Sequence, residues 1–337
     1  MVDKRDESFT FIVLALNHEE YIIEHLESIK FQVLTYGANL KVDVIVNDDC
    51  SRDSTRDLID RWFDSNRYLF RNVNFLYNSE NLGTCASLSN ALDLVVSDRC
   101  KVTAGDDVYS VEDIFELSFF DHEVSMLTGR VLYLRGSVIS FDFFTGILES
   151  STEIIYKGAP PLHRFKHLNF TNAPNLVYSM KCLNNCNVRD YVSRFDVVED
   201  WPLQVAIARE FPQKKVKLID QVLVYYRRTT GSTFIVANER FLNDKERVYD
   251  DLIEIKKNLL DGIRLVSRKK ALRRRGIASK IWNFDTYFFV LNVLIRLPTI
   301  ISRSRGVDMQ LNKHCEHYAQ IKKQANLFLS QSQEQKK

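Results

Sequence analysis

The sequence predicts an α/β fold in which helices flank a mostly parallel sheet, followed by a helical extension at the C-terminal end. Three observations predict it. Short apolar runs alternate with helical patterns four times before residue 110, each run ends in polar residues, and long helical patterns prevail from residue 236 onward. Alternating strands and helices are typical of a parallel sheet wound with crossover helices. At 337 residues the chain is long enough for such a domain and an appendage.

The composition is that of a folded globular protein. Charged residues make up 27% and aromatic residues 12% of the chain, which excludes a disordered or fibrous protein. The formal net charge is only +2, so overall charge indicates no particular partner. The six cysteines form no CxxC pair. This favours reduced thiols in a cytoplasmic protein over disulfides or zinc ligands.

Four strands are expected in the N-terminal part. Residues 9–16 (FTFIVLAL) are almost entirely apolar and precede a polar NHEE, as expected of a strand buried on both faces of a sheet. Charged residues precede this short run, and no small-residue cleavage site follows it, which favours a strand over a signal peptide. Later strands are expected at 42–47, 73–78 and 101–104, with helical patterns at 19–32, 58–63 and 86–96.

The pattern is less regular after residue 110. A helix is expected from Ser110 to about Phe120, with Ser110 as its N-cap and Asp113 in its first turn. The Gly, Pro and Asn clusters of 136–195 indicate loops. The remaining elements are expected at 124–134 (strand), 197–210 (turn and short helix) and 216–228 (strand or hairpin).

Polar residues follow every expected strand, at the carboxyl ends where open parallel sheets bind their ligands. Two of these ends carry adjacent carboxylates, Asp48–Asp49 and Asp106–Asp107. Acids that share one crevice repel one another unless cations or hydrogen-bond donors lie between them. A divalent cation bridging a diphosphate meets this requirement. The sequence has no GxGxxG or GxxxxGK[ST] motif, so we expect a nucleotide diphosphate without a dinucleotide or P-loop site.

Six stretches carry a resemblance to a known family: IVLALNHEEYIIEHLESI, VIVNDDCSRDST, NSENLGTCASLSNAL, KVTAGDDVYS, VVEDWPL and YYRRTTGST. In this order they resemble the successive motifs of family 2 glycosyltransferases of the GT-A fold, of the type that builds bacterial surface polysaccharides. The resemblance covers about residues 8–235. Each motif alone is a weak signal, and their order makes the resemblance specific. It implies a Rossmann-like, mixed but mostly parallel sheet.

The resemblance implies a nucleotide-sugar site at the strand ends. Asp49 accepts a hydrogen bond from the base, and Asp106 contacts the ribose. Asp107 binds Mg²⁺ or Mn²⁺ on the diphosphate, which Arg227 or Arg228 holds by bidentate contact. The other implied nucleotide-sugar contacts are Leu16, Asn17, Glu19, Asn81 and Gly83.

The resemblance also implies the chemistry. Glu199–Asp200 holds the general base, and we assign that role to Asp200, which takes the proton from the acceptor hydroxyl as its oxygen attacks the anomeric carbon. The metal offsets charge on the leaving nucleoside diphosphate, and the expected outcome is inversion. Residues 1–110 then form the nucleotide-sugar-binding half, 111–235 the acceptor and catalytic-base half, and 236–337 a helical C-terminal region.

The sequence departs from the family pattern in two places. Many members carry a further Asp before the acidic pair, where this chain has Ala104–Gly105, so Asp107 is the expected metal ligand by itself. A histidine common in the last motif is replaced by Thr229 or Thr230. Because these departures weaken the expected set of metal ligands, the alternative function is that of a catalytically inactive relative that binds glycan or acts as a scaffold.

Four other residues have structural as well as functional interpretations. For His18 a local loop contact is favoured over catalysis. His163 and His167 are four residues apart but lack an acidic third ligand at helical spacing, which favours a surface or acceptor-loop role over metal binding. Trp201 either stacks on a sugar ring or packs in the core.

The C-terminal region combines basic and apolar segments. Residues 264–280 contain eight Lys or Arg, and they precede the sequence IWNFDTYFFVLNVLIRLPTII. Asp285, Asn292 and Arg296 make this second segment too polar to span a bilayer comfortably. On a helix these three residues fall in one narrow stripe, and the rest of the circumference is apolar.

Such an arrangement fits an anionic membrane surface, bound through residues 264–301. The alternatives are packing on the catalytic domain or on another copy of the chain, as in a homo-oligomer. No nucleic-acid partner is expected, because no zinc-finger, RNP-like or helix-turn-helix pattern accompanies the charge.

We therefore hypothesise an inverting, metal-dependent glycosyltransferase that moves one sugar from a nucleotide sugar, expected to be UDP-linked, to a glycan hydroxyl. The acceptor is expected to be lipid-linked, in O-antigen or capsule biosynthesis, and the protein peripheral on the inner face of the cell membrane. The QxxRW-like motif of processive members is absent, which favours single addition. A nucleotidyltransferase would need a basic loop near the first strand, where ALNHEEYI is acidic.

Overall fold

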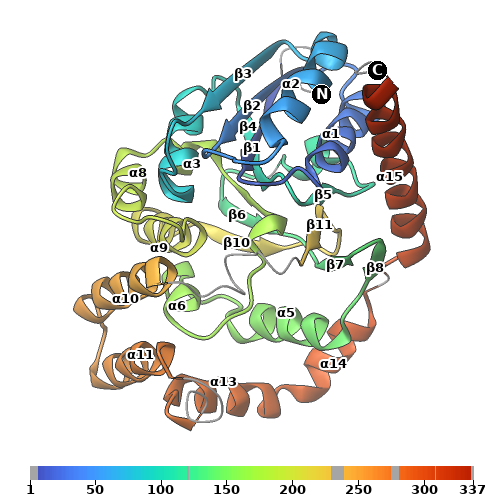
Figure 1. Ribbon diagram of the computed structural model, residues 1–337. Helices are drawn as coiled ribbons and strands as arrows, with labels where there is room; N and C mark the ends of the chain where they lie inside the picture. The colour runs from blue at the N-terminus through green and yellow to red at the C-terminus, as the bar shows by residue number, and fades with distance from the viewer. Residues whose placement is uncertain (1–6, 120, 229–238, 275–280, 308, 335–337) are drawn as a thin grey trace.

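The computed structural model describes residues 7–119, 121–228, 239–274, 281–307 and 309–334 (Figure 1). At its centre is a four-stranded parallel sheet in the order β3-β2-β1-β4. The strands are β1 (Ser8–Ala15), β2 (Lys41–Asp48), β3 (Asn72–Tyr77) and β4 (Arg99–Ala104). All four expected strands are confirmed to within two residues at their ends.

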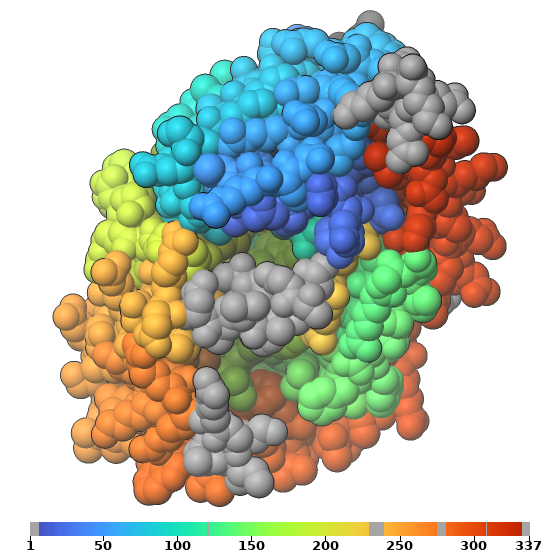
Figure 2. Space-filling view, in the orientation of Figure 1, coloured from blue at the N-terminus to red at the C-terminus, as the bar shows by residue number. Residues whose placement is uncertain are grey.

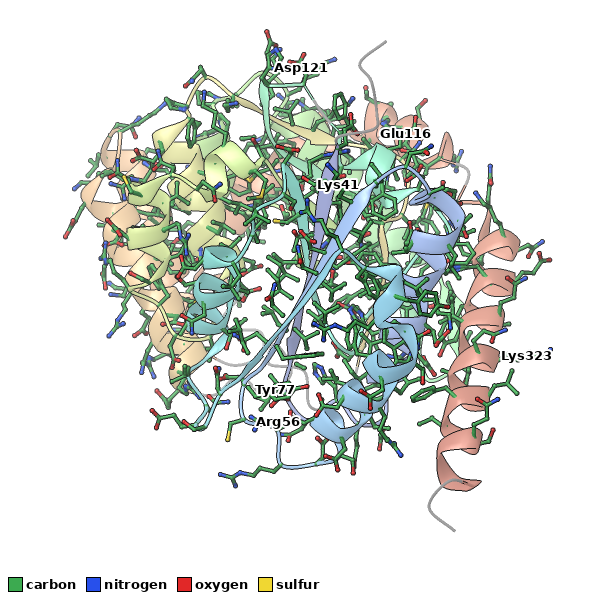
Figure 3. The ribbon with its side chains drawn as sticks, turned by 90° about the horizontal axis from the view of Figure 1, so that it is seen from above. Lys41, Arg56, Tyr77, Glu116, Asp121 and Lys323 are labelled. Atoms are coloured by element: carbon green, nitrogen blue, oxygen red, sulfur yellow. The ribbon has the colours of Figure 1, made fainter. Side chains whose placement is uncertain are left out.

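Helices cover both faces of this sheet, as Figure 3 shows from above. On one face lie α1 (Ile22–Tyr36) and α2 (Thr55–Asn66), which runs into the 3₁₀ turn η2 (Arg67–Leu69), and on the other lies α3 (Thr84–Asp93). Successive side chains of a strand point to opposite faces. Phe11 and Val13 therefore pack with α1 and α2, whereas Ile12 packs with α3. Burial on both faces explains why the sequence of β1 is continuously apolar.

Two smaller sheets follow β4, with the orders β5-β11-β7-β8 and β10-β6-β9. Residues 124–134, expected as one strand, are two strands in different sheets, and 216–228 divides in the same way. The chain changes sheet at Gly129–Arg130, whose amides donate to the carbonyls of Asn175 and Gln221. The strands are β5 (Val108–Tyr109), β6 (Val124–Thr128), β7 (Leu132–Arg135), β8 (Val138–Ser140), β9 (Leu176–Tyr178), β10 (Lys215–Leu218) and β11 (Val224–Arg227).

The interval 136–195 is more regular than its composition indicates. Besides β8 and β9 it contains α5 (Phe143–Ile155), α6 (Pro161–Lys166), the 3₁₀ turn η3 (Ala173–Asn175), α7 (Met180–Leu183) and α8 (Cys186–Val192). The Asp142 and Asn185 side chains cap α5 and α8 by accepting backbone N–H groups. Asn and Asp residues are common both in loops and at the first position of helices, and in this interval two of them begin helices.

The helix expected from Ser110 begins later. It is α4 (Ile114–Leu117), and its cap is Asp113, whose carboxylate accepts the amides of Phe115 and Glu116. Ser110 instead donates its hydroxyl to the Val222 carbonyl, which holds β5 beside β11. The expected short helix after residue 197 is confirmed as α9 (Asp200–Glu210).

The C-terminal region is helical, as expected. Its helices are α10 (Glu239–Glu254), α11 (Leu259–Leu272), α13 (Phe284–Ile295), α14 (Leu297–Arg305) and α15 (Leu311–Glu334). Helix α15 returns to the start of the chain and packs along α1, as Figures 1 and 2 show at the right edge of the molecule. No single helix in the described ranges is long and apolar enough to cross a bilayer, although α13 and α14, bent by 76°, pass that test together by length and composition.

Candidate functional site

The carboxyl ends of β1 and β4 define the place where a ligand of this sheet is expected. From β1 the chain continues to β2 and β3 on one side and returns through β4 on the other, which makes this the topological switch point. In Figure 3, Arg56 and Tyr77 lie at the carboxyl ends of the strands and Lys41 lies at the opposite end. The polar residues predicted after each strand therefore share one edge.

The loops after β1 and β2 hold each other in place. The backbone amide of Asn17 donates to Ser51 Oγ (2.8 Å), and the side-chain oxygen Oδ1 of Asn17 accepts the backbone amide of Arg52 (2.8 Å). Glu19 Oε2 accepts the Ser54 amide (2.9 Å) at the start of α2. The side chains of Asn17 and Glu19 thus shape the loop, and the exposed Leu16 presents apolar surface beside it.

Asp49 connects the second and third strand ends. Its Oδ1 accepts the Leu82 amide (2.7 Å) and Asn78 Nδ2 (2.9 Å), and its Oδ2 accepts the Gly83 amide (2.9 Å). Its neighbour Asp48 is buried and pairs with Arg56. Asp49 is therefore the residue that fixes the loop 78–83 over the sheet edge.

Gly83 joins this loop to the segment that precedes α9. Its φ of 88° is in the left-handed region, and a Cβ there would lie 2.3 Å from Asp196 Oδ1. The Cys85 amide donates to the Asp196 carbonyl (3.0 Å). Arg240 on α10 adds a second link, donating to Asp196 Oδ1 (2.6 Å) and to Asn81 Oδ1 (3.0 Å). The predicted nucleotide loop and the predicted base segment are thus in direct contact.

The acidic pair follows β4. Asp106 is half-buried, whereas Asp107 is only 2% exposed, and its Oδ1 accepts the Arg227 amide (2.8 Å). Among the described residues no other group donates to this carboxylate. Burial and the charge of Asp106 raise the pKa of Asp107 well above its usual range. Beneath it lies the buried Lys101, whose pKa burial lowers to about 8 while the charge of Asp107 opposes that shift.

These features fit a hard cation. A divalent ion would supply the counter-charge that the paired carboxyls lack, and carboxylate oxygens are its preferred ligands. In the described part of the chain no group of three or more His, Cys, Asp or Glu side chains is placed to hold a metal. A bound ion would therefore need ligands from water or from a diphosphate as well as from the protein.

Gly105 gives a physical reason for one departure from the family pattern. A Cβ at this position would lie 2.8 Å from Ile22 Cδ1 and 3.0 Å from His18 Nδ1. The start of α1 and the end of β4 approach so closely that a side chain at Gly105 would require Ile22 and His18 to shift. His18 packs against this glycine, in keeping with the local contact expected for it.

The two arginines after β11 have different surroundings. Arg227 is buried: Nε donates to the Asp106 carbonyl (2.6 Å), the guanidinium pairs with Glu24, and it stacks over the Tyr21 ring at 4.6 Å. Arg228 is exposed, with its guanidinium 4.1 Å from the centre of the Tyr133 ring. Arg228 is therefore the arginine whose charge reaches the surface. Thr229 and Thr230 lie outside the described residues.

Glu199 and Asp200 stand at the start of α9. The preceding turn is fixed by Asp244, whose Oδ2 accepts the amides at 196, 197 and 198 at 2.7 to 3.0 Å. Asp200 lies in the first turn of α9, where the helix dipole stabilises a negative charge. Lys245 on α10 faces it: burial lowers the pKa of Lys245, and the charge of Asp200 counteracts this.

Several residues near these carboxylates were not identified from the sequence. Arg240, Asp244 and Lys245 lie in α10, outside the six motifs, and Lys101 begins the motif KVTAGDDVYS but was given no role there. Only Lys101 had a signal, as a charged residue inside an apolar strand. Trp201, left open between two roles, packs in the core: Nε1 donates to the Phe165 carbonyl (2.9 Å), and its ring lies 4.8 Å from that of Tyr249.

His167 also has a different setting from the one expected. Its ring nitrogens lie 2.9 Å from Asp261 Oδ1 and 3.2 Å from Asp285 Oδ1. It is buried, so the preference for a surface or acceptor-loop position does not hold for this residue. The two carboxylates come from α11 and α13, which helical spacing around 163–167 does not reveal.

Comparison with known proteins identifies the N-terminal part of this site. Residues 10–120 match the family model described as glycosyl transferase family 2. This part of the chain belongs to that family. The matched residues include most of β1, all of β2 to β4, the loop interlocked by Asn17 and Glu19, and the acidic pair. The family 2 region thus holds the predicted nucleotide-sugar contacts except Arg227 and Arg228.

Sequence and structural relatives agree with the family 2 assignment. The abequosyltransferase RfbV of Salmonella typhimurium is 30% identical over 105 residues, which is 31% of this chain. The match covers about a third of that relative's length (30%). The structure of S. aureus TarS 1–349 with UDP-GlcNAc has a TM-score of 0.54 at 15% identity, covering 93% of this chain and 91% of that one. The mannosyltransferase PcManGT from Pyrobaculum calidifontis, in complex with GDP-Man and Mn²⁺, has a TM-score of 0.52 at 12% identity, covering 93% and 84%.

The family match confirms the predicted family for residues 10–120, and the solved structures confirm the predicted GT-A type of α/β fold. The individual roles assigned to the site residues stay predictions. The structure brings Leu16, Asn17, Glu19, Asp49, Asn81 and Gly83 to one sheet edge, and places Asp106 and Asp107 beside Arg227. The division of the chain at residues 110 and 235 also stays a prediction.

The raised pKa of the buried Glu199 carboxyl can be tested by measuring stability as a function of pH. Burial and the charge of Asp200 raise the pKa of Glu199 to about 8 from its ordinary 4.5. A raised folded-state pKa contributes stability below pH 4.5 that is lost as the pH rises toward 8. We expect Glu199→Gln to raise Tm relative to wild type by more at pH 8 than at pH 5.

Thermal unfolding across this pH range measures the effect. The matched control is Glu80→Gln, which changes an exposed carboxylate in the same way. A Tm difference between Glu199→Gln and wild type that stays constant from pH 5 to pH 8 would contradict the expectation.

Proposed function

We propose that this chain is an inverting, metal-dependent glycosyltransferase that transfers a single sugar from a nucleotide sugar, a UDP-sugar in the first instance, to a hydroxyl group of a glycan. The observation that carries the proposal is the contact between Gly83 and Asp196, which joins the nucleotide edge of the family 2 region to the segment bearing Glu199–Asp200. A donor site and a candidate general base are thereby built on adjoining loops.

The nucleotide is held by the interlocked strand ends. Leu16 is exposed at the end of β1 and suits contact with the flat face of a base. Asp49 and the loop at Asn81–Gly83 surround the same position, and Asp106 is accessible for the ribose. Arg228 is exposed and is the arginine proposed for bidentate contact with the diphosphate. Arg227 is buried and holds the acidic pair through hydrogen bonds to Asp107 Oδ1 and the Asp106 carbonyl.

Asp107, with Asp106 beside it, is the place for Mg²⁺ or Mn²⁺. The support is a buried carboxylate that, among the described residues, accepts only the Arg227 amide and whose pKa is raised by burial and by its neighbour's charge. When bound, the ion would offset negative charge on the departing nucleoside diphosphate. Lys101 and Arg227 supply part of the positive field in the protein itself.

Asp200 is proposed as the general base. It accepts the proton of the acceptor hydroxyl while that oxygen forms a bond to the anomeric carbon and the bond to the diphosphate oxygen breaks. One displacement of this kind inverts the anomeric configuration. Lys245 stabilises the carboxylate before the proton arrives, and the protonated Glu199 carboxyl adds no second negative charge at neutral pH.

The alternative is a catalytically inactive protein that binds glycan or nucleotide sugar. The experiment that separates the two uses purified protein and a panel of UDP-, GDP-, CDP- and dTDP-sugars with Mn²⁺, Mg²⁺ or EDTA. Release of the nucleoside diphosphate, with and without glycan acceptors, is the readout. Binding of a donor without metal-dependent turnover under any of these conditions would favour the inactive alternative.

The acceptor is proposed to be lipid-linked, in surface-polysaccharide assembly of the O-antigen or capsule type, with the protein on the inner face of the cell membrane. Similarity to an abequosyltransferase supports the glycan class. Helix α13 supports the proposed membrane association. Its Asp285 is fully buried and pairs with Arg264, so that the polar stripe of the helix faces the protein. Its exposed side is apolar: Phe284, Tyr287, Val290, Leu291, Leu294 and Ile295.

A groove of about 550 Å³ between α11 and α13 extends this apolar surface. Ile263, Val266 and Phe284 line it, and Lys270 and Arg274 stand on the same groove. Apolar side chains bordered by cations are the arrangement that docks on a bilayer containing anionic lipid. The segment 275–280, which is part of the predicted membrane-binding range, lies outside the described residues.

Substituting the exposed face of α13 tests this membrane proposal. Leu291→Asp with Leu294→Asp is expected to lower the bound fraction in flotation with phosphatidylcholine–phosphatidylglycerol vesicles by about tenfold or more, because two charges replace exposed leucines that would otherwise insert into the bilayer. The control is Leu34→Asp, since Leu34 on α1 is as exposed as Leu294 (60% and 61%). Equal flotation of the α13 variant and the wild type would contradict the membrane role and would favour packing of this face against a second copy of the chain.

A further inference from the structure

We infer that Tyr318, on the C-terminal helix α15, is a positioning residue for the acidic pair, acting through Glu24 and Arg227. The inference rests on the proposed function, because it concerns the proposed cation site. It assigns a part of that site to a helix that begins about two hundred residues after Asp107 and lies outside every motif of the resemblance.

The first step is the contact between Arg227 and both acids. The Arg227 amide donates to Asp107 Oδ1 (2.8 Å), and its Nε donates to the Asp106 carbonyl (2.6 Å). One residue thus fixes the side chain of one aspartate and the backbone of the other. Displacing Arg227 would therefore remove a donor from the Asp107 carboxylate and a contact that fixes the backbone at Asp106.

The second step is what holds Arg227. Its guanidinium is buried and pairs with Glu24 on α1, and Nη1 donates to the Gly136 carbonyl (3.4 Å) in the turn between β7 and β8. A buried cation keeps its place only when charged and polar partners surround it. Glu24 is the carboxylate that supplies this pairing, so its own position decides where the guanidinium lies.

The third step is the contact of α15 with Glu24. The Tyr318 hydroxyl donates to Glu24 Oε2 (2.9 Å), the same oxygen that Arg227 uses, and lies 3.4 Å from the Gly136 carbonyl. Tyr318 is 3% exposed, and burial together with the charge of Glu24 raises its pKa to about 12. The hydroxyl is accordingly a donor throughout the range in which enzymes work.

The rest of α15 is built to hold Tyr318 in this position. Its buried side chains recur every three or four residues along one face of the helix: His314, His317, Tyr318, Ile321 and Ala325. The Nδ1 atoms of His314 and His317 lie 2.9 and 3.1 Å from the hydroxyl of Tyr225, two residues before Arg227 on β11. Helix α15 therefore supports β11 from outside at two points, Tyr225 and, through Glu24, Arg227.

The test compares Tyr318→Phe with Tyr68→Phe. Phe keeps the packing of the ring and removes only the hydroxyl, and Tyr68 is 78% exposed, which makes it a matched control for the same chemical change. Binding of Mn²⁺ in the presence of UDP is measured by the loss of the free-ion EPR signal, so the readout needs no turnover. We expect Tyr318→Phe to weaken Mn²⁺ binding about three- to tenfold, the effect of losing one typical intramolecular hydrogen bond, while Tyr68→Phe binds as wild type.

Thermal unfolding of each variant accompanies the titration, so that a general loss of structure is recognised. Wild-type affinity in Tyr318→Phe, or no Mn²⁺ binding by the wild-type protein with UDP, would overturn the inference. Weakened Mn²⁺ binding combined with no donor turnover by the wild type would uphold the inference and count against the proposed catalytic function, so the two can fail separately.

Discussion

Replacing Asp200 with Asn is expected to lower kcat for sugar transfer by about 10²- to 10⁴-fold, the range that a positioned general base contributes. Asn keeps the shape of the side chain and can still accept the Trp201 amide, as Asp200 does at 2.7 Å, so the start of α9 should stay intact. Because an amide cannot take up the proton of the acceptor hydroxyl, the loss should appear in kcat, with KM for the donor little changed.

Initial rates with saturating donor and varied acceptor measure this effect. Glu199→Gln is the matched comparison, since it makes the same chemical change at the adjacent position. We expect it to retain far more activity than Asp200→Asn, because the Glu199 carboxyl, with its pKa raised to about 8, is protonated at neutral pH. A larger loss in Glu199→Gln than in Asp200→Asn would transfer the role of base to Glu199.

Asp107→Asn is expected to lower metal-dependent turnover by about 10²-fold or more, because it removes the charge of the carboxylate proposed to bind the ion. The amide oxygen can still accept the Arg227 amide, so the local backbone should be retained. The folded-state pKa of Asp107 is raised, and a raised pKa means that its ionised form lowers stability as pH increases. The variant should therefore unfold at a temperature no lower than the wild type at neutral pH.

Turnover as a function of Mn²⁺ concentration, together with Tm, checks this prediction. Asp64→Asn changes an exposed aspartate on α2 and serves as the control. If Asp107→Asn kept the Mn²⁺ dependence of the wild type while Asp106→Asn lost it, the half-buried Asp106 would be the metal ligand and Asp107 a support beneath it.

The central sheet was predictable because its signal is local. The central strands β1 and β2 are buried by helices on both faces, so most of their residues are apolar, and such an apolar run marks a strand. Strands β1 and β2, for example, pair in register from Ser8 with Lys41 to Ala15 with Asp48. The polar residues that follow them must then fall at one edge. This is why the nucleotide edge could be placed from the sequence with no knowledge of contacts.

The region 136–195 was not predictable in the same way. Apart from α5 its helices have four to seven residues, α5 and α8 begin at Asp and Asn caps, and its strands have only three residues each. Segments of this length carry too few residues to show a period. The interruption at Gly129 was missed for a related reason, since the apolar pattern of 124–134 continues through a point where the chain moves from one sheet to another.

The sequence by itself determined the family, the parallel sheet and the edge at which its carboxylates gather, because strand burial and chain order leave a local pattern. Only the tertiary structure decided which groups surround those carboxylates. Arg227, Glu24 and Tyr318 are separated by up to 294 positions and meet because β11, α1 and α15 pack together. The charge on Asp107 and Glu199 depends on an adjacent aspartate, which the sequence shows, and on burial, which only the packing of distant elements sets.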